Sequence, residues 1–272
     1  MNEFTRAGFR FPVISTGPAN GEPVVLLHGF PQDAAGFDAV AALLSAEGFR
    51  TLSPTQRGYA ASARPLRRRD YRLRELVADV RALVDAVGGP VHLVGHDWGG
   101  AVAWGVAARH PELIRSLTVL STPHPAALTS ALWHSNQGLR SWYMAYFQLP
   151  MVPEWTMTRP LPKMLRDSGL PAAAAERYAA AMAQDGALTA ALNWYRAVPL
   201  DRAFAVGTVA VPTSFVWGRK DFALGRYAAE ATGQHVSADY EFIQLDAGHW
   251  LPETRPTEVA DAVLGRIRRV RQ

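Results

Sequence analysis

The sequence contains no cysteine among its 272 residues. Disulfide bonds and a thiol nucleophile are therefore excluded, and the composition fits a reducing compartment, so we expect a cytoplasmic protein. No apolar run approaches the roughly 20 residues that span a membrane, and we expect no stable membrane insertion. Residues 1–6 lack a basic region followed by an apolar core, so no signal peptide is predicted.

The sequence also lacks metal-binding patterns, and its excess of positive charge is small. Six histidines show no metal-ligand spacing, and we expect neither a metal nor another cofactor; they are His92, His96, His110, His124, His134 and His235. The net charge is +4, with 28 basic against 24 acidic residues. The basic residues gather at 64–74 and 266–271, where no aromatic side chains interleave in a stacking pattern. This arrangement favours solvated surface, and no nucleic-acid partner is expected.

Short apolar runs alternate with helical patterns along most of the chain. After an opening hairpin at 4–16, strands are predicted at 24–27, 49–54, 90–94, 117–120, 213–217 and 240–245. Helices are predicted at 34–47, 71–87, 101–110 and 257–270, with another beginning near residue 224. This alternation predicts an α/β fold with a mostly parallel, doubly wound sheet.

The alternation stops between residues 122 and 206. This segment has no clear strand pattern and is rich in Trp, Tyr, Met and Ala. We interpret it as a helical cap, inserted after the sixth strand and covering the carboxyl edge of the sheet. Residues 1–121 and 207–272 would then form the core.

A carboxylate lies at a glycine-rich turn between a predicted strand and a predicted helix. The turn reads Gly95-His96-Asp97-Trp98-Gly99-Gly100 and follows the apolar run at 90–94. It has the layout of a nucleophile elbow with Asp97 in place of serine. Such a turn strains the central residue and needs small neighbours, because strand and helix backbones approach closely. The alternative from the local pattern is an ordinary helix with Asp97 as its N-cap.

Two more polar residues follow later strands. Asp221 comes after the 213–217 strand, and His249 comes after the 240–245 strand. Nucleophile, acid and histidine is the chain order of a hydrolase triad, and ligands of such sheets gather at the strands' carboxyl ends. Ser121 and Thr122 follow the 117–120 strand, so no carboxylate competes with Asp221 there.

A loop suited to binding an oxyanion follows the 24–27 strand. It reads His28-Gly29-Phe30-Pro31. The expected donors are the backbone N–H groups of Phe30 and Trp98, since Pro31 has no N–H to give. We interpret His28 as a residue that orders the loop.

Taken together, these motifs resemble the α/β-hydrolase-fold epoxide hydrolases over nearly the whole chain. The resemblance rests on the 28–31 loop, Arg57-Gly58-Tyr59, the Asp97 elbow, the Asp221 loop and Gly248-His249-Trp250. One departure is Thr55, where that family often has an acidic residue. The resemblance implies that Tyr143 and Tyr195, in two matching cap segments, hold and protonate the epoxide oxygen; Tyr146 lies one helical turn from Tyr143 and could replace it.

The chemistry follows from these residue types. Asp97 would attack an epoxide carbon and form an alkyl ester while a phenol protonates the leaving oxygen. His249, oriented by Asp221, would then activate water to release a vicinal diol. We expect an apolar or aromatic epoxide as the substrate, and a homodimer is left open. The expected pocket residues are His28, Pro31, Trp142, Tyr146, Trp194 and Trp250.

Two other functions stay open. A haloalkane or haloacid dehalogenase would use the same ester, and Trp98 beside the nucleophile suits it. Dehalogenases often carry Asn at the position of Phe30, and fluoroacetate dehalogenases carry arginines where this chain has Trp98 and Ala101. The other alternative is a receptor that binds a small molecule on the same fold without turnover.

Overall fold

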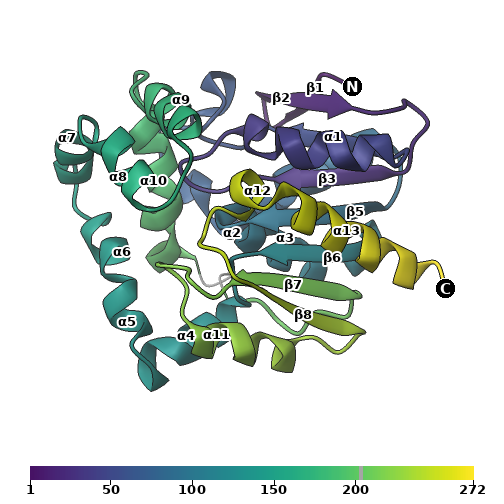
Figure 1. Ribbon diagram of the computed structural model, residues 1–272. Helices are drawn as coiled ribbons and strands as arrows, with labels where there is room; N and C mark the ends of the chain where they lie inside the picture. The colour runs from purple at the N-terminus through teal and green to yellow at the C-terminus, as the bar shows by residue number, and fades with distance from the viewer. Residues whose placement is uncertain (202–204) are drawn as a thin grey trace.

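The computed structural model describes residues 1–201 and 205–272. Eight strands form one sheet in the order β1-β2-β4-β3-β5-β6-β7-β8 (Figure 1). The β1–β2 hairpin and the β2–β4 pair are antiparallel, whereas β3 to β8 pair in parallel. The strands are β1 Glu3–Arg6, β2 Phe9–Thr16, β3 Pro23–Leu27, β4 Arg50–Pro54, β5 Val91–His96, β6 Ile114–Leu120, β7 Thr213–Gly218 and β8 Tyr240–Leu245.

Helices cover both faces of the sheet. Helices α1 and α13 contact each other on one face, and α2 and α3 contact each other on the opposite face. Alternate side chains of β3 point to opposite faces of the sheet. Val24 and Leu26 pack with α1 and α13, whereas Val25 and Leu27 pack on the face covered by α2 and α3. The core helices are α1 Asp38–Ala46, α2 Leu73–Val87, α3 Trp98–Arg109, α11 Arg226–Ala231, α12 Leu251–Thr254 and α13 Pro256–Val270. The predicted α/β-hydrolase architecture is confirmed.

Several element boundaries differ from the prediction; α3, for example, begins at Trp98 and not at residue 101. The helix expected from residue 34 begins as a 3-10 turn, η1 Ala34–Phe37, before α1. Strand β6 begins at Ile114, three residues before the predicted start. The exposed Arg115 interrupts the apolar run in the sequence, but it does not interrupt the strand. Helix α11 begins after residue 224, because the carboxylate of Asp221 already binds the N–H groups of Ala223 and Leu224.

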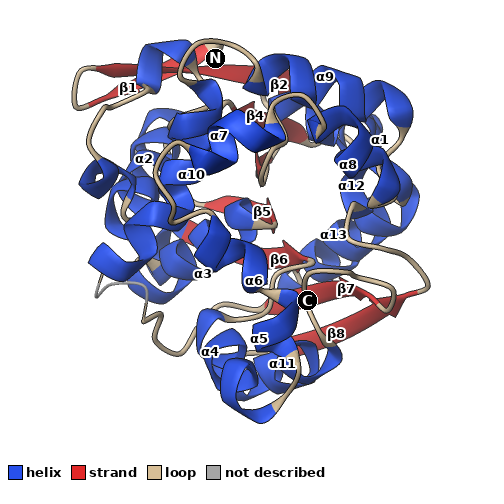
Figure 2. Cartoon of the chain, turned by 90° about the vertical axis from the view of Figure 1, so that its left-hand side faces the viewer, coloured by secondary structure: helices blue, strands red, loops and turns tan. Residues whose placement is uncertain are grey.

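Within the described part of 122–206 the chain forms helices and turns and no strand. The helices are α4 Pro125–His134, α5 Gln137–Arg140, α6 Trp142–Tyr146, α7 Val152–Met157, α8 Leu161–Asp167, α9 Ala172–Met182 and α10 Ala187–Ala197. Helices α5 to α8 and α10 face the viewer in Figure 2, in front of the ends of the central strands. Helix α4 instead contacts α11 of the core. The cap boundaries stay a prediction, and residues 202–204 lie outside the described residues.

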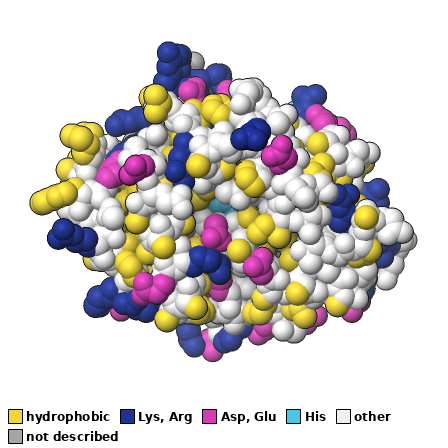
Figure 3. Space-filling model, turned by 90° about the horizontal axis from the view of Figure 1, so that it is seen from above, with side chains coloured by type: hydrophobic (Ala, Val, Ile, Leu, Met, Phe, Trp, Pro, Cys, Tyr) yellow, Lys and Arg dark blue, Asp and Glu magenta, His cyan; other side chains and the backbone are white. Residues whose placement is uncertain are grey.

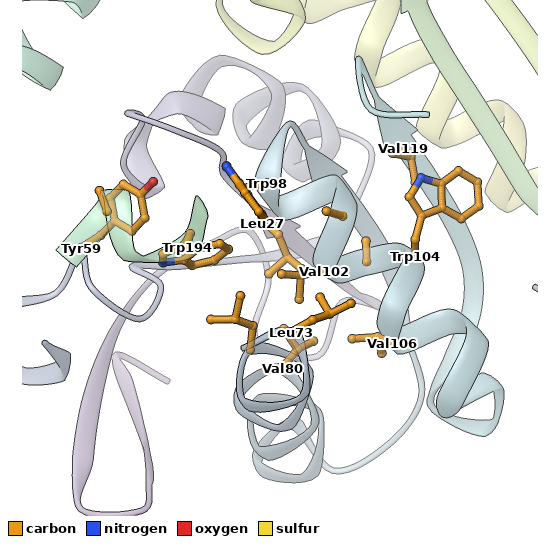
Figure 4. Packing of buried hydrophobic residues seen from close by; sticks show 14 of the residues in the cluster. Leu27, Tyr59, Leu73, Val80, Trp98, Val102, Trp104, Val106, Val119 and Trp194 are labelled. Atoms are coloured by element: carbon orange, nitrogen blue, oxygen red, sulfur yellow. The ribbon is translucent and has the colours of Figure 1, made fainter. Parts of the chain in front are cut away.

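Helix α10 joins the cap to the core through aromatic packing. Figure 4 shows Trp194 of α10 between Tyr59 and Trp98, beside the aliphatic side chains of α2 and α3. Its ring centroid lies 5.9 Å from that of Tyr59 and 5.7 Å from that of Trp98. Its indole N–H donates to the carbonyl of Arg57 at 2.8 Å. The next residue, Tyr195, lies beside the Asp97 turn, with its ring centroid 4.9 Å from that of Trp98.

Candidate active site

Asp97 occupies a strained turn between β5 and α3. Its φ angle is 50°, in the left-handed region that side chains rarely adopt. A Cβ on Gly99 would lie 2.1 Å from the carbonyl oxygen of Leu27, so only glycine allows this close approach. The Asp97 side chain makes no capping hydrogen bond to α3. The geometry is therefore that of an elbow and not that of an ordinary N-cap.

The structure brings Asp221 and His249 to Asp97. His249 Nδ1 lies 2.8 Å from Asp221 Oδ2, and His249 Nε2 lies 3.7 Å from Asp97 Oδ2. The other oxygen of Asp221 accepts the N–H groups of Ala223 and Leu224 at 2.8 and 2.9 Å. Since the Asp221 side chain is fully buried, these bonds fix the carboxylate that orients the imidazole.

The charges in this cluster shift one another's pKa values. Burial alone would lower the pKa of His249, but the carboxylates of Asp221 and Asp97 raise it to about 9. Burial raises the pKa of Asp97, and His249 together with the N–H groups of Phe30 and Trp98 opposes that rise. The carboxylate charges therefore favour the protonated imidazole at neutral pH.

The loop after β3 supplies a donor to the same carboxylate. The N–H of Phe30 donates to Asp97 Oδ1 at 2.7 Å, and the Trp98 N–H also hydrogen-bonds to Asp97. A Cβ on Gly29 would lie 2.4 Å from the Asp97 Cβ, so glycine lets the loop come this close. Both N–H groups predicted for the oxyanion hole thus hydrogen-bond to the Asp97 carboxylate, and that of Phe30 binds Oδ1.

Two tyrosines stand across from Asp97. The rings of Tyr143 and Tyr195 lie 6.2 Å apart, and both residues line the same two cavities as Asp97. The indole of Trp98 donates to the Tyr195 hydroxyl. Burial and the charge of Asp97 raise the pKa of both phenols, so both stay protonated at neutral pH. Each can donate a proton toward the cavity.

The larger of these cavities, about 350 Å³, is mainly apolar. Phe30, Pro31, Trp142 and Trp250 line it together with Asp97, His249 and the two tyrosines. Cap residues and the residue after Asp221 complete the wall, and the sequence analysis did not single these out; they include Phe147, Met157, Leu161, Leu165 and Phe222. Among them only Phe222 had a sequence signal, its place next to Asp221.

Three residues expected in the pocket do not line this cavity, and those predictions are wrong. The His28 ring is buried behind the loop, where Nε2 accepts the Gln56 N–H at 3.3 Å. Trp194 is turned toward the core and donates to Arg57. Tyr146 points away and hydrogen-bonds Thr156 through its hydroxyl, so Tyr143 and not Tyr146 is the tyrosine that meets Asp97.

The sequence analysis also missed a buried polar network behind His249. His96 Nε2 lies 2.9 Å from the His249 carbonyl oxygen, and His96 Nδ1 lies 2.7 Å from Gln32 Oε1. The same Gln32 oxygen accepts the Gly29 N–H, and the Gln32 amide donates to Glu253 at 2.6 Å. The network therefore ties the 28–31 loop to the backbone of His249.

Neither a metal site nor a membrane span is found in the part of the chain that the structure describes. Residues 1–201 and 205–272 contain no group of three or more His, Asp or Glu side chains that could hold a metal ion. Across the same residues, no helix has both the length and the apolar character needed to cross a membrane.

The chain is similar to proteins of known family. A family model described as an alpha/beta hydrolase fold matches residues 22–256. The AB hydrolase superfamily protein YfhM of Bacillus subtilis (strain 168) is 35% identical over 268 residues, which covers 94% of each chain. Epoxide hydrolase 3 of Xenopus tropicalis is 33% identical over 93% of this chain and 73% of its own. The crystal structure of epoxide hydrolase A from Mycobacterium thermoresistibile matches with a TM-score of 0.85 and 27% identity over 98% of this chain and 97% of that one.

Proposed function

The chain belongs to the α/β-hydrolase fold family and, within it, to the epoxide hydrolases, and we propose that it converts an epoxide to a vicinal diol through an ester of Asp97. The observation that carries this proposal is one cavity lined by a carboxylate, two tyrosines and a histidine. The carboxylate can attack carbon, the phenols can protonate the leaving oxygen, and the histidine can activate water.

In the first step, Asp97 Oδ2 attacks an epoxide carbon. This oxygen is free to react because Oδ1 is held by the Phe30 N–H, and His249 Nε2 is 3.7 Å away, beyond hydrogen-bonding distance. The carbon–oxygen bond of the ring breaks as the ester bond forms. The epoxide oxygen takes a proton from Tyr195 or Tyr143, and the resulting phenolate is reprotonated from solvent.

The second step is hydrolysis of that ester. Esterification removes the negative charge of Asp97, which is one of the charges that raise the pKa of His249 to about 9. The imidazole then loses its proton more readily and serves as the base for a water molecule. His249 takes a proton from water, which adds to the Asp97 carboxyl carbon, and the oxyanion forms on Oδ1, the oxygen that the Phe30 N–H already binds. When the oxyanion collapses, the bond between that carbon and Oδ2 breaks, and the diol leaves with Oδ2 after His249 returns the proton.

The donors around Asp97 favour an epoxide over a haloalkane. A leaving halide needs N–H donors in the cavity, but the indole N–H of Trp98 is already given to the Tyr195 hydroxyl. Phe30 presents an apolar side chain to the cavity where an amide would be the second donor. A leaving alkoxide needs a proton instead, which the phenols of Tyr143 and Tyr195 can donate.

A substrate panel tests this proposal. Aryl and alkyl epoxides are incubated beside haloalkanes, and diol and halide are both measured. We expect diol from at least one epoxide, no halide from any haloalkane, and no diol from the Asp97→Ala variant. Halide release without diol would assign the site to a dehalogenase, whereas tight binding without turnover of either class would assign it to a receptor.

A further inference from the structure

Seven large hydrophobic side chains are exposed on helices α5 to α8 and the turns between them. We call this surface the apolar cap face; it consists of Leu139, Trp142, Leu149, Met151, Val152, Trp155 and Met164. Trp155 is 85% exposed and Met151 is 77% exposed. The helices that carry these residues face the viewer in Figure 2, and hydrophobic side chains protrude at the left edge of Figure 3, the side on which α7 lies. An exposed apolar surface of this extent is typical of an interaction site.

Part of the apolar cap face continues into the active-site cavity. Leu139, Trp142 and Met164 are exposed and also line the 350 Å³ cavity. A protein seated on these three residues would close the route that a substrate takes to Asp97. The partner that best fits the apolar cap face is therefore one that still lets an apolar substrate enter the cavity.

The chemistry of the face suits the headgroup region of a lipid bilayer. No hydrogen bond joins the indole N–H of Trp142 or Trp155 to any described residue, and exposed indoles are favoured at membrane surfaces. Met151 and Val152, next to Trp155 at the start of α7, give the same region an apolar edge that shallow insertion would bury.

The charges on the same helices add a positive balance. The carboxylates of Glu154 and Asp167 are paired with Arg196 and Lys163. Arg140 donates only to carbonyl oxygens, and Arg159 pairs with no carboxylate among the described residues. Two guanidinium charges are therefore unpaired beside the exposed indoles; that of Arg159 is exposed and available to anionic headgroups, whereas Nε of Arg140 is buried.

We propose that the apolar cap face binds the surface of a lipid bilayer that contains anionic lipid, and that apolar substrates enter the cavity from that surface. The binding is peripheral, since shallow insertion of a few side chains is enough. The part that concerns substrate entry rests on the proposed epoxide hydrolysis, whereas the binding itself does not.

The binding is tested by sedimentation with vesicles. The whole protein is mixed with phosphatidylcholine vesicles, either pure or containing an equal amount of phosphatidylglycerol. The test variant is Met151→Ser/Trp155→Ser, because neither residue lines the cavity. The matched control is Leu66→Ser, since Leu66 is 97% exposed and lies outside the apolar cap face. We expect the wild type and the control to bind the mixed vesicles most strongly, and the double variant to bind them about tenfold or more weakly.

Turnover separates this proposal from the proposed function. The double variant should hydrolyse a water-soluble epoxide at the wild-type rate and a long-chain epoxide held in vesicles several-fold more slowly. Failure of the wild type to sediment with either kind of vesicle, or equal sedimentation of the double variant, would overturn the proposal. A dimer of the wild type that the double variant loses, without vesicle binding, would assign the face to a second copy and also overturn it. Vesicle binding without turnover of any epoxide would support the binding and refute the proposed function.

Discussion

Replacing the two cavity tyrosines by phenylalanine should slow ring opening while leaving the fold intact. Each phenol can give one hydrogen bond to the developing alkoxide in a cavity lined mainly by apolar side chains. Loss of one such donor in a water-excluded site costs about 10²- to 10³-fold in rate. We therefore expect about 10²-fold lower kcat for Tyr195→Phe or Tyr143→Phe, and a larger loss for the double variant than for either single one.

The two substitutions differ in what they do to stability. The Tyr195 hydroxyl accepts the indole N–H of Trp98, so Tyr195→Phe leaves that N–H unsatisfied at a cost of about 1–3 kcal/mol. No described residue hydrogen-bonds to the hydroxyl of Tyr143, so its loss leaves no partner unsatisfied. Tyr143→Phe should therefore lower activity with little change in the free energy of unfolding.

The assay measures single-turnover rates of ester formation from an epoxide, with thermal unfolding of each variant beside it. Tyr59→Phe is the matched control, because the Tyr59 hydroxyl is buried without a hydrogen-bond partner and the residue does not line the cavity. It should keep the wild-type rate and the wild-type stability. A double variant of Tyr143 and Tyr195 that opens epoxides at the wild-type rate would refute the role given to the phenols.

Three other substitutions probe the surroundings of the site. Asp97→Asn should lower the pKa of His249 from about 9, as measured by NMR titration of the imidazole. In the wild type, the stability that depends on protonated His249 is present below pH 6.5 and is lost as the pH rises toward 9. The variant should therefore lose less free energy of unfolding over that pH range. Gly29→Ala should abolish activity, because the added Cβ meets the Asp97 Cβ at 2.4 Å, whereas Gly265→Ala, with nothing within 4 Å, should not. Glu253→Ala should lower the free energy of unfolding by about 1–3 kcal/mol in a denaturant titration, since the Gln32 amide and the Tyr178 hydroxyl lose their acceptor. For each of the three variants, an unchanged value in its measurement would contradict the contact on which the prediction rests.

The catalytic candidates were predictable because each is set by a short local pattern. The glycines of the Asp97 turn allow the backbones to pack closely, since a Cβ on Gly99 would lie 2.1 Å from the Leu27 carbonyl oxygen. Such a glycine pattern is visible in the sequence. Asp221 and His249 follow strands that pair in parallel as neighbours, so the order of strands brings their side chains together. Because parallel strands end at the same edge of the sheet, residues that directly follow such strands come together at that edge.

The pocket wall was less predictable because it depends on how the cap helices rotate. Apolar residues of the cap serve either its own packing or the cavity, and the helical pattern alone does not distinguish the two. Trp194 turned toward Arg57, and Tyr146 turned toward Thr156, although both carry side chains suited to a pocket. The network of His96, Gln32 and Glu253 joins residues that are up to 221 positions apart, and no local pattern indicates such contacts.

The covalent ester on Asp97 is tested most directly by trapping it. His249→Gln removes the base for the second step and leaves Asp97, Phe30 and the tyrosines in place, so the ester should form and persist. The account predicts that an epoxide turned over by the wild type adds its full mass to the intact variant, and that digestion places the added mass on the peptide containing Asp97. A variant that stays unmodified with such an epoxide, or that carries the mass on another residue, would contradict it.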